Sequence, residues 1–117
     1  MKTLMIAAAA AIASPVSAED WRLVNWDSET VLYIDHARLT PGAGTVKYWA
    51  RVVYLKDPAY AEIVSQVAVR CDARLYKNIN ITGIYRTGAT HAERPKAPWA
   101  EVAPGTNIER EMQHVCR

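Results

Sequence analysis

Alternating apolar and polar residues along much of the chain predict antiparallel β-strands. The alternation is cleanest over residues 62–76. One set of positions carries Ile63, Val67, Val69, Cys71, Ala73 and Leu75, and the other carries Glu62, Gln66, Arg70, Asp72 and Arg74. A period of two with one apolar face is typical of a half-buried antiparallel strand. We therefore expect Cys71 to point into the core, and Arg70 and Arg74 to point away from it.

A second long strand is predicted over residues 45–55, which are rich in β-branched and aromatic side chains. Tyr48 and Ala50 would lie on one face, and Trp49 and Arg51 on the opposite, less buried face. Shorter strands are predicted at 21–26, 31–35, 79–86 and 99–102, and turns at 41–44, 57–58, 77–78 and 87–88. Residues 89–98, which include two prolines, are predicted to form an irregular loop.

The pattern becomes helical after residue 105. Thr106 and Glu109 have the spacing of a capping box, in which the two side chains bind free amides at the start of a helix. Ile108, Met112 and Val115 follow at helical spacing and form one apolar stripe, with Cys116 beside it. A helix of about ten residues is marginal alone. The pattern therefore predicts an α+β fold, in which a C-terminal helix packs on one face of an antiparallel sheet.

The first 18 residues have the features of a secretory signal peptide. Lys2 precedes an apolar run over residues 3–13, and Val16-Ser17-Ala18 has the small residues of a cleavage site. The apolar run is too short to cross a bilayer, which takes about 20 residues. We expect cleavage near Ala18, a single domain over residues 19–117, and a periplasmic or secreted protein without a membrane span. Because Glu19, and not a cysteine, directly follows the expected cleavage site, we expect no lipid anchor.

The chain has two cysteines, Cys71 and Cys116. In an exported domain of this size, an even number of cysteines is typical of a disulfide. The predicted disulfide would join the core side of the strand at 62–76 to the end of the helix. Closing such a loop stabilises a protein by about 4 kcal/mol through the lost freedom of the unfolded chain.

Charge and chemistry narrow the classes of function. The formal net charge of +2 falls to +1 when Lys2 leaves with the signal, so the chain lacks the basic excess of a nucleic-acid-binding protein. His36, His91 and His114 are not at metal-ligand spacing. Asp35 is better explained as the end of a strand than as the partner of its neighbour His36. We find no nucleophile elbow or phosphate-binding loop, and expect no catalytic residue, metal or cofactor.

Four tryptophans are many for a domain of this size. We expect most of them to fill the core, with Trp49 as the exception. Trp49 alternates with Arg51 on the less buried face of its strand, and the strand at 62–76 presents Arg70 and Arg74 on its own polar face. Tryptophan and arginine are enriched at protein interfaces. We therefore predict a partner-binding surface around Trp49, Arg51, Arg70 and Arg74, if the strand registers agree.

Several short motifs are spread over nearly the whole predicted domain. They are Trp21, Tyr33-Ile34-Asp35, Tyr48-Trp49-Ala50-Arg51-Val52, Arg70-Cys71-Asp72, Tyr85, Trp99-x-x-Val102-x-Pro104-Gly105-Thr106 and Val115-Cys116. Together they resemble the surface-adhesin protein E family of small exported bacterial proteins. The more usual family order at the central cysteine is Asp before Cys, whereas Asp72 follows it here. The resemblance implies a sheet of about six strands, a disulfide-tethered helix, homodimers, and adhesion to host matrix proteins in pathogen members.

Three hypotheses of function follow. The first is an exported, non-enzymatic binding module of the adhesin E type, with a host matrix or envelope protein as partner. The second is a periplasmic or secreted inhibitor of a cell-wall or host enzyme, which would present an ordered protruding loop at 89–98. The third is an enzyme of unknown type, which would show a deep pocket with clustered titratable groups.

Overall fold

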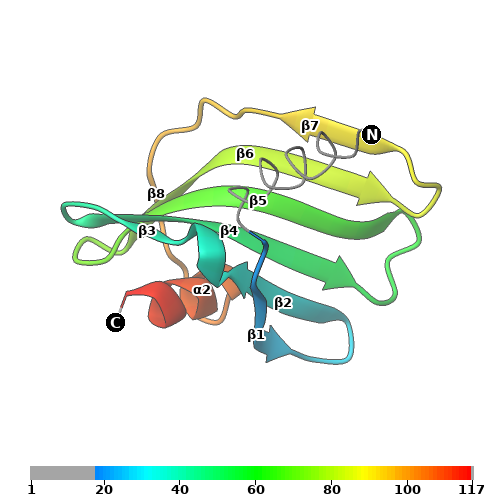
Figure 1. The fold of residues 1–117 in the computed structure, drawn as a ribbon, viewed down its shortest axis with the longest axis horizontal. Coiled ribbons are helices and arrows are strands. Elements are labelled where there is room, and N and C mark those ends of the chain that lie inside the picture. The colour runs from blue at the N-terminus through cyan, green and yellow to red at the C-terminus, as the bar shows by residue number, and fades with distance from the viewer. Residues whose placement is uncertain (1–17, 117) are drawn as a thin grey trace, which may run out of the picture.

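One antiparallel sheet forms the body of the protein, and a short helix lies against one of its faces (Figure 1). The computed structural model describes residues 18–116. Its strands are β1 (Trp21–Trp26), β2 (Thr30–Asp35), β3 (Thr40–Pro41), β4 (Thr45–Tyr54), β5 (Tyr60–Arg70), β6 (Leu75–Tyr85), β7 (Thr90–Glu93) and β8 (Ala100–Glu101). The helical elements are the 3₁₀ turn η1 (His36–Arg38) and the helix α2 (Asn107–Val115).

Six strands form the continuous path of the sheet, in the order β1-β2-β4-β5-β6-β7. The two-residue strands β3 and β8 pair with β4 and β6, outside that path. The prediction of an antiparallel sheet with a C-terminal helix is confirmed, and so is the disulfide that ties the helix end to the sheet.

The core lies between α2 and the strands β2, β4 and β5. Its fully or nearly buried apolar side chains are Leu32, Ile34, Tyr48, Ala50, Val67, Val69, Val102 and Met112. Tyr48 and Ala50 come from alternate positions of β4, as the period of two requires. Figure 1 shows α2 close to β1, β2 and β4, whereas β7 lies at the far edge of the sheet.

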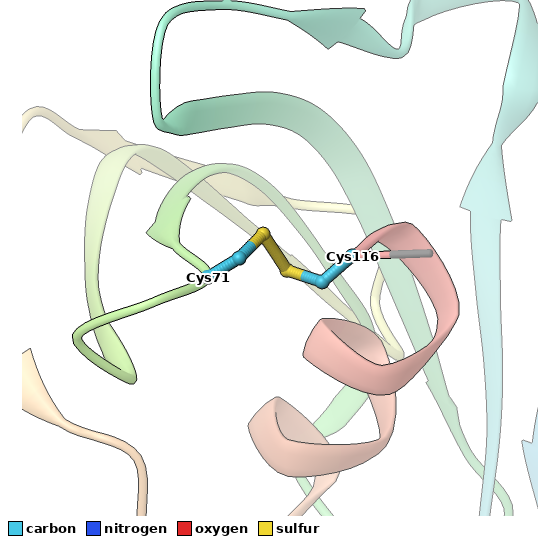
Figure 2. Close-up of a disulfide and its surroundings, with 2 residues drawn as sticks. All are labelled: Cys71 and Cys116. Atoms are coloured by element: carbon cyan, nitrogen blue, oxygen red, sulfur yellow. A yellow bond between two sulfur atoms is a disulfide. The ribbon is translucent and has the colours of Figure 1, made fainter.

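The start and the end of α2 are both fastened. At the start, the Thr106 hydroxyl oxygen accepts a hydrogen bond from the Glu109 amide at 3.3 Å, as the capping-box spacing predicts. The Glu109 carboxylate accepts from the Gly105 amide, at 3.0 Å. At the end, Cys116 is bonded to Cys71 with a Cα–Cα distance of 5.7 Å (Figure 2).

The prediction of one strand over residues 62–76 is wrong. β5 ends at Arg70 and β6 begins at Leu75, so the chain reverses between them. Arg74, with a φ of 54°, takes the left-handed conformation that a tight reversal often needs. The apolar alternation continues through Cys71 and Ala73, which concealed the turn in the sequence. Cys71 therefore lies just beyond the end of a strand, where it still contacts the core.

Two further boundaries differ from the predicted ones. The turn expected at 77–78 lies inside β6, where the pairing with β5 shifts register between Gln66 and Val67, as at a β-bulge. The loop expected at 89–98 begins with β7, which pairs with β6 from Ile81 to Ile84. Backbone pairing with a long neighbouring strand overrides the weak local preference of these segments.

The predicted signal peptide falls almost entirely on residues 1–17, which lie outside the described residues. Among the described residues, none of the helices has the length and apolar character needed to cross a bilayer.

Candidate functional site

Strand register decides which side chains share the sheet face opposite α2, which we call the outer face. Tyr48 and Ala50 face the core, so Trp49 and Arg51, which alternate with them along β4, lie on the outer face. Trp49 stands opposite Gln66 of β5, and Arg51 stands opposite Val64. Directly opposite residues point to the same side of a sheet, so the outer face extends across β5.

The tryptophans gather on the outer face, which corrects the expectation that most of them fill the core. Tyr33 of β2 lies opposite Arg51, so Tyr33 is on the outer face. Val31 and Asp35 share that face by alternation, and they lie opposite Trp26 and Trp21 of β1. Trp99 joins the same side, because the guanidinium of Arg70 lies 4.3 Å from the centre of its ring. None of the four belongs to the core cluster.

A cavity of about 350 Å³ opens on the outer face among these aromatic rings. Trp21 and Trp49 line it, together with two arginines and two carboxylates, which are Arg38, Arg51, Glu19 and Glu62. Strands β1, β4 and β5 contribute to it, along with η1 and the residues that precede β1. We call this cavity the outer pocket.

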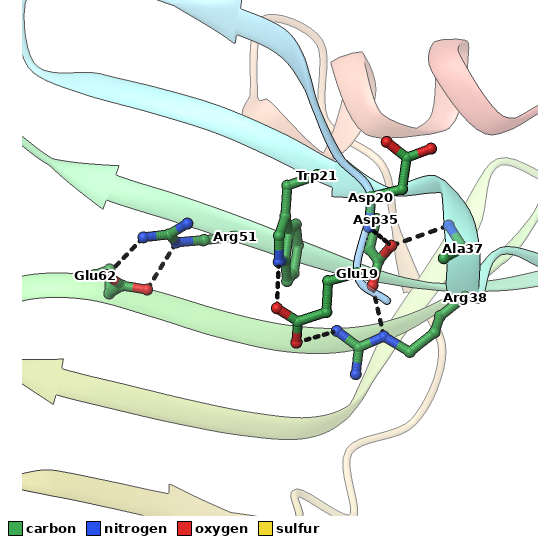
Figure 3. Close-up of polar contacts among 8 residues, drawn as sticks. All are labelled: Glu19, Asp20, Trp21, Asp35, Ala37, Arg38, Arg51 and Glu62. Carbon is green, nitrogen blue, oxygen red and sulfur yellow. Dashed lines mark hydrogen bonds and ion pairs between the residues drawn. The ribbon is translucent and has the colours of Figure 1, made fainter. Parts of the chain in front are cut away.

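Arg38 connects the two tryptophans of the outer pocket. Its guanidinium lies 4.9 Å from the ring centre of Trp49 and 5.7 Å from that of Trp21, within the range of a cation–π contact. Its Nε donates to Asp35 at 2.6 Å, and its Nη2 donates to Glu19 at 3.3 Å (Figure 3). Two carboxylates and two indole rings therefore fix the position of this one cation.

Asp35 holds the Arg38 guanidinium in position from the buried side. Its side chain is fully buried, and it accepts hydrogen bonds from the backbone amides of Asp20 and Ala37 as well as from Arg38 (Figure 3). Burial alone would raise the pKa of Asp35, but these hydrogen bonds and the Arg38 charge outweigh it and hold the pKa below its ordinary value. As predicted, Asp35 ends a strand and begins a turn, since it is also the N-cap of η1.

Arg51 and Glu62 form the other wall of the outer pocket. Nε and Nη2 of Arg51 donate to the two carboxylate oxygens of Glu62, at 2.8 and 3.0 Å (Figure 3). This two-point geometry orients the guanidinium plane strongly. The hydrogen bond from Arg51 to Glu62 raises the pKa of Arg51, so its charge is permanent.

The structure brings together three of the four residues predicted for partner binding. Trp49, Arg51 and Arg70 lie on the outer face. Arg70 is opposite Thr45, four residues or about 13 Å along the strand from Trp49. Arg74 does not belong with them: it lies in the turn after β5, and its Nη2 donates to Glu109 of α2 at 3.1 Å.

Sequence reasoning missed Trp21, Arg38, Glu19 and Glu62 as residues of the outer pocket. The spacing from Asp35 to Arg38 matches an acidic cap followed by a cation in the same turn, and could have indicated that pair. The other contacts join segments that are distant in sequence. Within residues 18–116, no cluster of three or more His, Cys, Asp or Glu side chains is arranged to hold a metal ion.

A domain of this construction, a disulfide-tethered α+β fold with an aromatic and arginine-lined sheet face, has the composition of a protein-binding module. The chain belongs to the surface-adhesin protein E family, whose family model matches residues 21–117. This confirms the resemblance drawn from the motifs. Comparisons with curated proteins and with solved structures gave no significant match. Family membership indicates an adhesin-type binding function and an exported protein.

Proposed function

We propose that this protein is an exported, non-enzymatic binding module that holds a protein partner against its outer face, with the outer pocket at the centre of the contact. One observation carries the proposal: the four tryptophans lie outside the core, and two of them line a pocket with Arg38 and Arg51. A partly exposed apolar side chain outside the core offers its free surface to a partner.

The electrostatics of the outer pocket favour a protein partner over a small charged substrate. Arg38 is paired with Asp35 and Glu19, and Arg51 with Glu62. Each arginine charge is thus compensated by at least one carboxylate, and the indole rings remain as the larger contact area. Trp and Arg side chains that are held rigid lose little conformational entropy on binding, which is why they dominate the energy of many interfaces.

A host matrix or envelope protein is the partner class that fits the family. Self-association is the other proposed use of the same side of the sheet. β1 is an edge strand of the main path, and its Leu23 and Trp26 are 51% and 67% exposed. An exposed apolar edge strand offers both side chains and free backbone groups to a second copy, so we propose a homodimer that forms along β1.

The inhibitor hypothesis loses part of its structural basis, because only residues 89 and 94–98 of the expected loop are irregular. It required an ordered loop protruding at 89–98, but the first part of that segment is β7, which pairs with β6. A strand in the sheet is not free to enter the active site of another protein.

The test is a double variant, Trp49→Ala with Arg51→Ala, compared with Arg74→Ala as a matched control on the helix side. Binding to a panel of immobilised matrix proteins is measured by surface plasmon resonance, and self-association by analytical ultracentrifugation. We expect the double variant to bind or associate at least tenfold more weakly, because truncation of central Trp and Arg residues often costs 2 kcal/mol or more. The control should be unchanged.

Because Trp49 is half-buried, folding is checked by near-ultraviolet circular dichroism, and a second variant, Trp21→Ala, removes a ring at the sheet edge instead. Weaker binding by a folded Trp21→Ala variant supports the proposal as well. If the folded variants bind and associate as strongly as the unchanged protein, the outer pocket is not the binding site.

A further inference from the structure

Two histidines that are 78 residues apart in sequence are in contact where η1 lies beside the end of α2. His36 belongs to η1, and His114 to the last turn of α2. Their Nε2 atoms are 2.7 Å apart, and their ring centres are 4.9 Å apart. The two imidazole rings therefore face one another through their Nε2 atoms. Their separation in the sequence matches no metal-binding motif.

Both rings are carried by firmly attached backbone. The amide of His36 donates to the Asp20 carbonyl oxygen at 2.9 Å, and the buried Asp35 carboxylate caps the turn by accepting from the Ala37 amide. On the other side, α2 is held by the buried Met112 and by the disulfide of Cys116. Elements fixed in this way present the two nitrogens together before any ligand arrives, which lowers the entropy cost of binding.

In this contact a proton is shared by two imidazole nitrogens that could instead both bind a metal ion. When neutral imidazoles share a hydrogen bond through Nε2, one ring donates and the other accepts. A zinc ion with two Zn–N bonds of about 2.0–2.1 Å at a tetrahedral angle would hold such nitrogens about 3.4 Å apart. The two nitrogens would have to move apart by about 0.7 Å, and small rotations of these half-buried side chains allow such a movement.

We propose that His36 and His114 form a binding site for one divalent transition-metal ion of the zinc and copper class. Imidazole nitrogen is a preferred ligand of both ions. The metal takes the place of the shared N–H, the donor ring moves its proton from Nε2 to Nδ1, and solvent completes the coordination. The bound ion would clamp η1 to the end of α2.

The arginines on the same two elements are each engaged with oxygen atoms away from the two imidazole nitrogens. Arg110 of α2 donates to the carbonyl oxygens of Gly105 and Thr106, at 3.3 and 3.4 Å, and so is directed toward the start of the helix. Arg38 of η1 is directed at the Asp35 and Glu19 carboxylates of the outer face. Its charge is therefore compensated there.

The test is calorimetric titration of the disulfide-bonded protein, without a polyhistidine tag, with Zn²⁺ and separately with Cu²⁺. We expect one ion per chain, and at least a tenfold loss of affinity in His36→Gln and in His114→Gln. Glutamine keeps a hydrogen-bonding group but is a far weaker metal ligand. His91→Ala is the matched control, since His91 is exposed on β7 and should not affect binding.

Electron paramagnetic resonance of the Cu²⁺-loaded protein gives an independent measurement that does not require a folded variant. Coupling of the copper to two nitrogens supports the site, and each glutamine variant that folds should retain only one. Absence of binding, equal affinity in the glutamine variants, or an equal loss in His91→Ala would overturn the proposal.

Discussion

At the scale of single residues, Glu111 is the least expected group in this structure. It lies on the buried side of α2, only 6% exposed, and its carboxylate accepts a hydrogen bond from the hydroxyl of the fully buried Tyr48 at 2.8 Å. Burial raises the pKa of Glu111 to about 7, and the hydrogen bond from Tyr48 opposes this only in part. Burial, and next the neighbouring Glu111, raise the pKa of Tyr48, so the phenol remains the donor.

This raised pKa predicts a pH-dependent stability. The contribution of Glu111 is fully present below its unfolded pKa of about 4.5, and it is lost as the pH rises through the folded pKa of about 7. Glu111→Gln should abolish that loss. The free energy of unfolding of the variant, relative to the unchanged protein, should therefore rise by about 3 kcal/mol between pH 4.5 and pH 8.

Urea denaturation at a series of pH values measures this difference. Glu101→Gln, on the exposed strand β8, is the matched control and should leave the pH dependence unchanged. A pH dependence that is identical in Glu111→Gln and the unchanged protein would show that Glu111 does not ionise in this range.

At the scale of elements, the stability of α2 depends on its two ends. The helix has nine residues, too few to be stable alone. Its cap at Thr106 satisfies an otherwise free amide, and its disulfide keeps it near the sheet when the cap is weakened. We therefore expect the cap to contribute to stability without deciding whether the helix docks.

Thr106→Ala should lower the free energy of unfolding by about 1 kcal/mol, the usual contribution of an N-cap hydroxyl. Thr106→Ser retains the hydroxyl and should lie close to the unchanged protein. Thermal and urea denaturation of the oxidised protein measure both variants. If the alanine variant proved as stable as the serine variant, the hydroxyl would not be the stabilising cap.

At the scale of the whole molecule, the two faces of the sheet have separate roles. The face toward α2 carries the core, and the outer face carries the tryptophans and the outer pocket. The residues just before β1 contribute to the outer pocket. Glu19 accepts hydrogen bonds from the Trp21 ring nitrogen at 3.0 Å and from Arg38 at 3.3 Å. Glu19 is also the first residue of the domain expected after signal cleavage.

We therefore predict that the exported protein begins at Glu19, so that processing leaves this pocket residue in place. Intact-mass spectrometry of the protein recovered from the periplasm or the medium should give the mass of residues 19–117 with one disulfide and no lipid. Retention of residues 1–18, cleavage beyond Glu19, or a lipid adduct would each contradict the prediction.

Much of the fold could be predicted because its determinants are local or leave a period in the sequence. The α+β class, the capped helix and the disulfide all follow from side-chain periods and residue counts, and all are confirmed. The reversal at 71–74 could not be predicted in this way, because the apolar alternation continues through it. Where β5 ends is decided by pairing between β5 and β6, and not by the residues of the turn alone.

The sequence by itself determined that Trp49 and Arg51 share one face of a strand, because alternation within a strand is local. Only the tertiary structure decided what lies beside them. The register between β4 and β5 puts Arg70 on the same face, η1 brings Arg38 onto Trp21 and Trp49, and the turn after β5 takes Arg74 to the helix side. The meeting of His36 with His114 has the same origin. Contacts between residues far apart in sequence depend on strand register and packing, and neither leaves a periodic pattern in the amino-acid sequence.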